Sequence, residues 1–478
     1  MAVHPLEALS RLFTNWSGEE PLGIIPIGES GSERNYFRLT GKERTAIGVY
    51  HPVPEETAAF LAFTRHFKAS GLNVPQIYLE DPATSTYLEE DLGDISLFQI
   101  INTGQEFSRE AHQLMEKSLE ALVQFQVVAG NGLDYAKCYP RSSFDAQSVE
   151  WDLNYFKYNF LKLFVIFNEQ NLEDDFQRLT GYLLSAPSHY FMYRDFQSRN
   201  ILVKNGSPWF IDYQGGRHGP LAYDVASILF QVKARIPDRH RESLGEFYCR
   251  ALKSQGVDPD RDFRPFYDAF ILVRLLQVLG AYGFRGIIQR KAHFIESIPF
   301  ALARLKWWLE HAILPIALPE LHRSLEKLAS IETFPKIIPE ADEGGFTVEV
   351  SSFSYQQGIP VDYSGHGGGF VFDCRALPNP GREERYRLFT GKDPIVEEFL
   401  AKESGVAAFL EHAQRLVDQS VETYLGRNFT RLSVWFGCTG GLHRSVYCAE
   451  RMARHLRQKF PRISIIICHR EIGSNLTP

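Results

Sequence analysis

The feature that most constrains this chain is a pair of polar segments, Tyr193–Asn200 and Ile211–Gln214. The first segment carries Asp195 and Asn200, and the second carries Asp212. Between them, two short apolar runs flank an Asn-Gly turn, and this pattern predicts a β-hairpin. Such a hairpin would deliver the aspartate of the second segment to the side chains of the first.

These side chains match the roles that phosphoryl transfer requires. A kinase needs a carboxylate that orients the attacking hydroxyl and accepts its proton, and an Asn with a second Asp that hold magnesium. Asp195 is therefore the predicted base, and Asn200 and Asp212 are the predicted metal ligands. A single Asp is more often a turn cap or a strand end, so the joint spacing is what indicates a kinase with ATP and Mg²⁺ as cofactors.

Residues up to about 330 resemble the aminoglycoside phosphotransferase superfamily of protein-kinase-like small-molecule kinases. Within it, they are most similar to the anomeric kinases of N-acetylmuramate and N-acetylglucosamine. The resemblance implies a two-lobed α+β domain that phosphorylates a sugar hydroxyl in cell-wall sugar recycling. It rests on the segments Tyr193–Asn200, Ile211–Gly216, His218–Pro220, Tyr223–Asp224, Val278–Gly280 and Ile298–Pro299.

In that superfamily, a loop between the first two strands covers the phosphates of ATP. Here the loop is Gly28–Leu39, in which Ser30, Gly31 and Ser32 would let backbone amides approach an anion. Arg34 would add a charged hydrogen bond. An ordinary hairpin turn is the alternative for this segment taken alone.

The strand expected at residues 45–50 contains no lysine, although a lysine there usually contacts the α and β phosphates. Arg34 or Arg38 is expected to take its place. The hinge between the two lobes is expected near Glu90 and Leu92, whose main chain would contact the adenine.

Two residues of the expected helical lobe are candidates for contact with the substrate. Glu150 stands where the resembled sugar kinases present a carboxylate to sugar hydroxyls or to the acetamido group, and Arg199 lies in the catalytic segment. For Glu150, an ordinary polar residue on an amphipathic helix is an equal alternative. Tyr193 replaces the His that commonly precedes the Arg-Asp pair, and this exchange leaves the base and the metal ligands in place.

A chain of 478 residues with 44% hydrophobic content is longer than one such kinase, so a second domain is expected. Prolines and an acidic Gly-Gly pair predict a linker at 331–345, between a kinase domain at 1–330 and a second domain at 346–478. In the second domain, an apolar strand leads into a glycine loop that opens a helix, which predicts a phosphate site. Its candidate residues are Gly437, Cys438, Thr439, Gly440, Gly441, His443, Arg444 and Ser445.

Residues 346–472 resemble the C-terminal domain of RapZ-type RNase adapter proteins. The resemblance implies binding of an aminosugar phosphate, glucosamine 6-phosphate, and of small RNAs. An insertion at Tyr363–Phe370 and the absence of the N-terminal nucleotide-binding domain usual in those proteins are departures from the family pattern. The motifs that carry the resemblance include Ser352–Tyr355, Gly358–Asp362, Val371–Asp373, Leu377–Pro380, Gly437–Val446 and Cys468–Glu471.

Other interpretations of the second domain are weaker. The spacing from Cys438 to Arg444 matches the Cys-x5-Arg loop of phosphatases, but a small buried cysteine is the favoured interpretation. A basic stripe with Arg451, Arg454 and Arg457 would support an RNA partner, against the favoured alternative of an ordinary solvated helix face.

Composition adds limits on location and cofactors. The six cysteines show no metal-ligand spacing, so no zinc site is expected. Neither a signal peptide nor an apolar run of membrane-spanning length is expected, which predicts a cytoplasmic protein without a membrane partner.

The predicted fold class is an α+β protein-kinase-like two-lobed domain followed by an α/β domain with a glycine-loop anion site. The predicted function is that of an ATP- and magnesium-dependent sugar kinase fused to a sugar-phosphate sensor. One alternative is a regulatory RNA- or RNase-binding adapter with a degenerate kinase half. Another is a kinase of aminoglycosides or amino alcohols. The sequence leaves the acceptor hydroxyl and the oligomeric state open.

Overall fold

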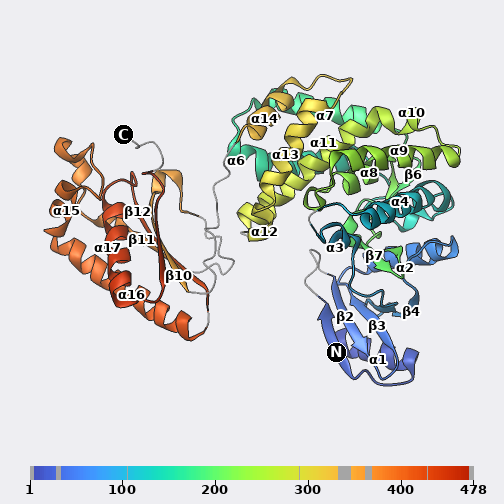
Figure 1. Ribbon diagram of the computed structural model, residues 1–478, viewed down its shortest axis with the longest axis horizontal. Helices are drawn as coiled ribbons and strands as arrows, with labels where there is room; N and C mark the ends of the chain where they lie inside the picture. Colours follow the sequence, from blue (N-terminus) through green and yellow to red (C-terminus); the bar gives the residue numbers. More distant parts are fainter. Residues whose placement is uncertain are drawn as a thin grey trace. The chain divides into compact units, whose positions relative to one another are not determined.

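The computed structural model describes residues 5–27, 34–104, 106–289, 291–331, 346–360, 369–427 and 429–472. The chain divides into two compact units, residues 1–283 with 297–332 and residues 284–296 with 333–478. Figure 1 draws most of the first unit from blue to yellow and the chain after residue 346 from orange to red.

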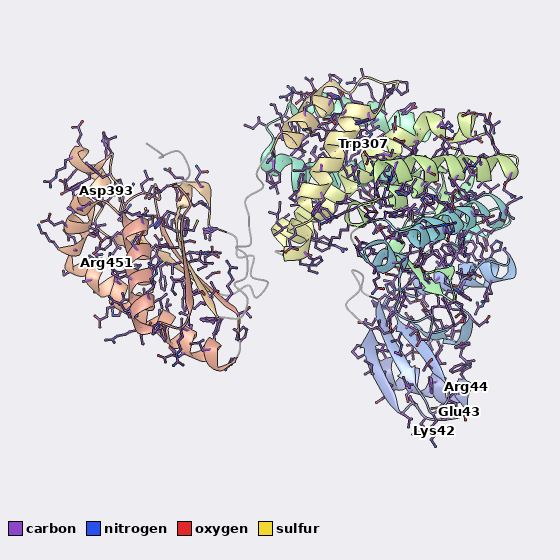
Figure 2. All side chains as sticks on the ribbon, viewed as in Figure 1. Lys42, Glu43, Arg44, Trp307, Asp393 and Arg451 are labelled. Atoms are coloured by element: carbon purple, nitrogen blue, oxygen red, sulfur yellow. The ribbon has the colours of Figure 1, made fainter. Side chains whose placement is uncertain are left out.

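The first unit contains a five-stranded antiparallel sheet of order β1-β2-β3-β5-β4. The amphipathic helix α1 (Pro5–Ser17) buries Leu9 and Phe13 against Leu39 and Leu88 of the sheet. Lys42, Glu43 and Arg44 mark the tip of the turn between β2 and β3 (Figure 2). The strands are β1 Gly23–Ile27, β2 Asn35–Thr40, β3 Thr45–Tyr50, β4 Ile77–Asp81 and β5 Thr86–Glu89.

A helical lobe follows the sheet. Helix α2 (Pro54–Ala69) connects β3 to β4 and begins with a proline and two acidic residues, which favour a helix N-terminus. The other helices of this unit are α3 Leu97–Ile101, α4 Arg109–Val123, α5 Ala146–Phe156, α6 Lys162–Phe164, α7 Glu169–Leu184, α8 Ala222–Leu229, α9 Asp238–Ser254, α10 Pro259–Asp262, α11 Arg264–Ala281, α13 Ile298–His311 and α14 Pro319–Ala329. Helix α12 is Ala292–Ile295.

Two short antiparallel strand pairs lie inside this lobe and carry the site. Strand β6 (Tyr190–Met192) pairs with β9 (Arg217–Gly219), and β7 (Ile201–Lys204) pairs with β8 (Ser207–Phe210). The residues of the β7–β8 turn, Asn205 and Gly206, have φ angles of 54° and 70°, which an Asn-Gly turn provides. The hairpin predicted from the sequence is therefore present.

Helix α11 is the central helix of the lobe and packs against α5, α8 and α13. With its continuation to Ile288, it is long and apolar enough to cross a membrane by length and composition. This corrects the expectation that no apolar run reaches such a length. Most of its apolar window is buried inside the protein, as in the core helix of a globular domain, and the segment is weak evidence for a membrane span.

The second unit is built on a four-stranded parallel sheet of order β11-β12-β10-β13. Its strands are β10 Thr347–Ser354, β11 Gly369–Asp373, β12 Arg431–Cys438 and β13 Ser464–His469, and its helices are α15 Pro394–Ala401, α16 Ser404–Gly426 and α17 Arg444–Lys459. Arg451 lies on α17, and Asp393 immediately precedes α15 (Figure 2).

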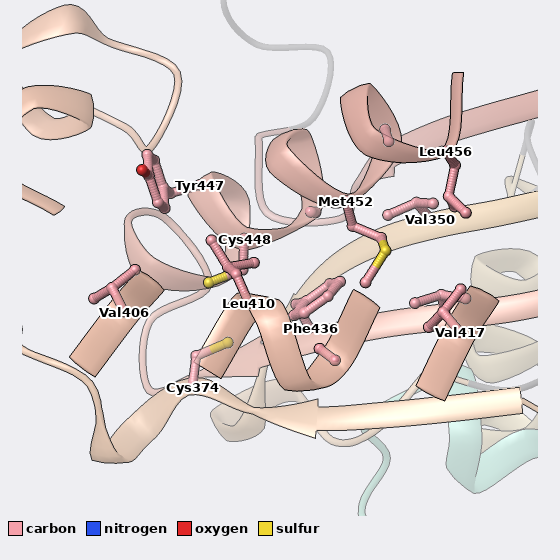
Figure 3. Close-up of a cluster of buried hydrophobic side chains, with 14 of the residues drawn as sticks. Val350, Cys374, Val406, Leu410, Val417, Phe436, Tyr447, Cys448, Met452 and Leu456 are labelled. Carbon is pink, nitrogen blue, oxygen red and sulfur yellow. The ribbon is translucent and has the colours of Figure 1, made fainter. Parts of the chain in front are cut away.

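The core of the second unit lies between this sheet and its helices. Val350 and Phe436 from the sheet contact apolar side chains of α16 and α17, among them Val417 and Met452 (Figure 3). Parallel strands buried in this way need helices over them, and α16 and α17 provide that cover. The two-lobed α+β domain and the following α/β domain agree with the fold class predicted from the sequence.

Candidate active site

The segment Tyr193–Asn200 forms the loop between β6 and β7, and a buried carboxylate fixes its start. The main-chain N–H groups of Tyr193 and Arg194 each donate a hydrogen bond to Asp224 on α8, both at 2.8 Å. Gln126 donates a third, at 3.1 Å. Burial raises the pKa of Asp224 to about 7, against the lowering effect of these three donors. Asp224 lies in one of the segments on which the family resemblance rests, Tyr223–Asp224, but no role was predicted for it from the sequence.

Two residues of the site have left-handed backbone conformations that are costly for non-glycine residues. Arg194 has a φ of 74° and Asp212 a φ of 70°. Backbone strain of this kind persists where surrounding contacts fix the local geometry. One such contact is the hydroxyl of Tyr193, which donates to the Ile211 carbonyl at 2.7 Å. The tyrosine that replaces the usual His thus ties the loop to the segment that presents Asp212.

The structure brings the three predicted catalytic residues together. The side-chain amide of Asn200 donates to the Asp195 carbonyl and to Asp212 Oδ2, both at 2.9 Å. The carboxylate of Asp195 is half-buried and makes no hydrogen bond or ion pair within the described residues, so it is available to accept a proton. Burial, and then the charge of Asp195, raises the pKa of Asp212.

These residues fit a magnesium ion by their donor chemistry. The Asn200 side chain uses its Nδ2 for both hydrogen bonds, which leaves Oδ1 without a donor among the described residues. Gln214 donates to Asp212 Oδ1 at 2.7 Å and so orients the carboxylate. Carboxylate and amide oxygens are the ligands that magnesium prefers, and two neighbouring carboxylates gain from a cation between them. No cluster of three His, Cys, Asp or Glu side chains suited to a metal occurs in the described part of the chain.

On the nucleotide side, Ser30, Gly31 and Ser32 lie outside the described residues. Arg34 is buried and pairs with Glu56 of α2, with 3.0 Å between Nη2 and Oε1. The charge of Arg34 also acts to lower the pKa of Asp212, against the larger effect of burial. Protein kinases pair a strand lysine with a helix glutamate in the same way. The Arg34–Glu56 pair is of the same kind, and the replacement of the missing lysine by Arg34 stays a prediction.

Arg38 has a different partner from the one expected. Its guanidinium forms hydrogen bonds with two carboxylates of the expected hinge, Asp91 at 2.7 and 3.1 Å and Asp94 at 2.8 and 3.0 Å. This pairing connects β2 to the hinge, so the charge of Arg38 is already neutralised. The main-chain groups expected to contact adenine include the Leu92 N–H and the Glu90 carbonyl, and neither makes a hydrogen bond within the described residues.

On the acceptor side, Glu150 is exposed and makes no contact that links it to Asp195. Arg199 is also exposed, although its charge acts on Asp212. The buried carboxylate near the base is instead Asp152, two residues along α5 from Glu150. Burial raises the pKa of Asp152, and the charge of Asp195 adds to that shift. An acidic residue on the apolar face of α5 was the sequence signal that could have identified it.

The glycine loop of the second unit differs in detail from the predicted phosphate site. Thr439 and Gly440 are exposed, whereas Cys438 is buried with its Sγ 3.1 Å from Ser445 Oγ. Arg444 is buried and donates to the carbonyls of Arg375 and Leu377 at 2.8 and 3.1 Å. These contacts agree with a small buried cysteine and not with an exposed nucleophile.

Three other neighbours define this loop. Gly437 is packed so closely against Phe353 that a Cβ there would lie 2.4 Å from the ring. His443 Nε2 lies 3.0 Å from the Tyr386 carbonyl. A Cβ on Gly441 would lie 2.6 Å from Glu471 Oε2, so a carboxylate already approaches the loop. An anion at that point would require this carboxylate to move or to be neutralised.

The basic stripe on α17 is partly neutralised. Arg451 and Arg454 lie 4.0 and 3.7 Å from Glu397, and Lys459 pairs with Asp418 at 2.9 Å. Arg444 belongs to the interior and not to the surface. These pairings weaken the argument for an RNA-binding surface on this helix.

Comparison with known proteins adds independent information. A model of the phosphotransferase enzyme family matches residues 23–265, and a model of the RapZ C-terminal domain matches residues 346–473. An N-acetylmuramate/N-acetylglucosamine kinase of Pseudomonas aeruginosa is 26% identical over 325 residues, which are 66% of this chain and 90% of the relative. A choline/ethanolamine kinase family protein of Mesorhizobium loti has a solved structure with a TM-score of 0.43 and 16% identity, covering 68% of this chain and 98% of that one.

A nucleotide-binding protein of Methylococcus capsulatus is 39% identical over 123 residues, which are 26% of this chain and 39% of the relative. This chain spans only 39% to 56% of the first nucleotide-binding relatives that it matches. The match over residues 23–265 covers more than half of the 478 residues, and the chain therefore belongs to the phosphotransferase enzyme family, with a RapZ C-terminal domain after it.

Proposed function

We propose that this protein is an ATP- and magnesium-dependent kinase that phosphorylates a hydroxyl of N-acetylmuramate or N-acetylglucosamine in cell-wall sugar recycling. The observation that carries the proposal is the grouping of Asp195, Asn200 and Asp212, with the Asp195 carboxylate free of any hydrogen bond within the described residues. The likeness to a kinase of these two sugars supports the choice of acceptor.

In this proposal, each residue has one task. Asp195 orients the attacking sugar hydroxyl and takes its proton. Asn200 and Asp212 hold the magnesium ion, which when bound neutralises charge on the phosphates. Arg34, held by Glu56, contacts the nucleotide phosphates.

We further propose the division of labour expected from the sequence, with a kinase domain at 1–330, a linker at 331–345 and a sugar-phosphate-binding domain at 346–478. The glycine loop of β12 and α17 is the proposed sugar-phosphate site. The linker lies almost entirely outside the described residues, and the cytoplasmic location stays a prediction of the sequence.

The test is ADP release from ATP and magnesium with N-acetylmuramate, N-acetylglucosamine, glucosamine, kanamycin or choline as acceptor. Asp195→Asn should lower kcat by about 10²- to 10⁴-fold because it removes the proton acceptor without changing the size of the side chain. Asp174→Asn on α7, away from the loop, is the matched control and should retain wild-type turnover. Absence of turnover with every acceptor would favour the alternative of a regulatory RNA- or RNase-binding adapter. Turnover only with kanamycin or choline would show that the acceptor is an aminoglycoside or an amino alcohol instead of a sugar.

A further inference from the structure

A buried arginine without a carboxylate partner lies beside the predicted base. Arg217 of β9 is 1% exposed, and its Nε donates to the Gly215 carbonyl at 3.0 Å. Its Nη1 is buried and has no hydrogen-bond partner. Asp195 approaches the same glycine, because a Cβ on Gly215 would lie 3.8 Å from Asp195 Oδ2. The charge of Asp195 also acts on the Arg217 guanidinium.

This arrangement is costly in the free protein. Burial, and then the charge of Arg194, lowers the pKa of Arg217 to about 10, so the side chain still carries its charge at neutral pH. A buried charge that lacks a counterion loses hydration without compensation. Such a group is compensated when a ligand brings an anionic oxygen to it.

Two further arginines act on the neighbouring carboxylate, Asp152. Arg194 is half-buried, and its guanidinium makes no hydrogen bond or ion pair within the described residues. Arg274 of α11 is buried and donates to the Tyr223 hydroxyl at 2.8 Å, while its Nε has no partner. Arg274 also bonds Gln277, which in turn donates to Asp152 Oδ1 at 2.9 Å.

Carboxylates lie in the same region, but none of them is bonded to Arg217 among the described residues. The guanidinium groups of Arg194, Arg217 and Arg274 share this region with the carboxylates of Asp195, Asp152 and Asp224. Asp224 already accepts three hydrogen bonds, from the main chain of Tyr193 and Arg194 and from Gln126. An acceptor with a carboxylate would supply the missing anionic partner.

We propose that Arg217, assisted by Arg194, binds a carboxylate of the acceptor sugar, so that the site favours N-acetylmuramate over the neutral N-acetylglucosamine. Arg274 holds Gln277 and Asp152 in place and is a positioning residue. This inference rests on the proposed sugar-kinase function. The other anionic group that can approach Asp195 is the terminal phosphate of ATP. The experiment below distinguishes binding of this phosphate by Arg217 from binding of the sugar carboxylate.

The experiment measures kcat/KM for both sugars with the full-length protein, and the ratio between them is the readout. Wild-type protein should prefer N-acetylmuramate. Arg217→Gln should lower the ratio by about 10- to 100-fold, because it removes a charged hydrogen bond that only the carboxylate sugar makes. Arg217→Lys, which keeps the positive charge, should restore part of the preference.

Arg241→Gln is the matched control. Arg241 is equally buried, its pKa is also lowered to about 10 by burial and then by Arg304, and its Nε also lacks a partner. Its hydrogen-bond partners are the Ile236 carbonyl and Asp238, not Asp195. This variant should leave the ratio between the two sugars unchanged.

The outcomes separate the possible sources of the anion. If Arg217→Gln lowers kcat/KM equally for both sugars and raises the KM for ATP, Arg217 binds the phosphate of the nucleotide, and the proposal is overturned. A wild-type protein that turns over both sugars equally would also overturn it, while leaving the sugar-kinase function intact. If Arg217→Gln fails to fold, calorimetric binding of N-acetylmuramate and N-acetylglucosamine to Asp195→Asn protein without nucleotide gives the decisive comparison. Equal affinity for the two sugars would reject the subsite.

Discussion

Glu89, the last residue of β5, is a buried acid that the proposed mechanism does not use. Its Oε2 has no hydrogen-bond partner, and burial raises its pKa to about 8, against a lowering effect of Arg34. A folded-state pKa above that of the unfolded chain means that the folded protein holds the proton while the unfolded chain releases it. The free energy of unfolding therefore falls as pH rises from about 4.5 to about 8.

Glu89→Gln should remove this part of the pH dependence, because the amide stays neutral at every pH. The variant should match the wild-type free energy of unfolding below the ordinary glutamate pKa. It should exceed the wild type by on the order of 1–3 kcal/mol above pH 8. Urea unfolding at several pH values measures this, with exposed Glu55→Gln as the control for loss of one negative charge. If the free energy of unfolding depends on pH in the same way for Glu89→Gln and wild type, the raised pKa of Glu89 is contradicted.

At the scale of elements, the connection between β2 and the hinge is the clearest case in which contacts change an assignment made from sequence. Arg38 is one of two candidates for the missing strand lysine, yet it is bound by two carboxylates of the expected hinge, Asp91 and Asp94. It lowers the pKa of Asp94 through these hydrogen bonds. The pairing fixes the hinge relative to the sheet, and the hinge is where the adenine is expected.

Arg38→Gln should raise the KM for ATP several-fold and change kcat less, because it loosens the hinge without touching the phosphates. The effect on stability should be small, about 1 kcal/mol or less, since the pair is partly exposed. Steady-state kinetics at varied ATP measures it, with Arg44→Gln at the β2–β3 turn as the control. A fall in kcat at unchanged KM would instead place Arg38 at the transferring phosphate.

At the scale of the whole molecule, each unit has its own sheet, and the apolar core of the second unit is made entirely from residues 346–467. Separate cores allow separate unfolding transitions. A ligand stabilises only the part of a protein that binds it. The nucleotide should therefore act on one transition, and a core substitution in the second unit on the other.

Met452→Ala should lower the stability of the second unit by about 2–5 kcal/mol, because Met452 is fully buried in that core (Figure 3). ATP with magnesium at 100 times its Kd should stabilise the first unit by about 2.7 kcal/mol. Calorimetry of the full chain should show that each change moves a different transition. A single transition that both changes shift together would show that the units unfold as one.

The local sequence pattern was enough to predict those parts of the protein in which the residues that come together are close in sequence. The Asn-Gly turn predicted the β7–β8 hairpin, and the hairpin predicted that Asp212 returns to Asp195 and Asn200. The strand expected at residues 45–50 is present as β3, and the two resemblances predicted both folds. These inferences succeed because a turn and a few neighbouring residues set the local geometry.

The sequence by itself determined the two folds, and it predicted the grouping of Asp195, Asn200 and Asp212 and an arginine in place of the usual lysine. Only the tertiary structure decided which arginine pairs with Glu56, which carboxylate lies near the base, and which buried groups lack partners. Arg34 immediately precedes β2, Asp152 lies on α5 and Arg217 lies on β9, and no local spacing relates them. The physical reason is that burial and charge pairing depend on contacts between segments distant in sequence, which exist only once the chain is packed.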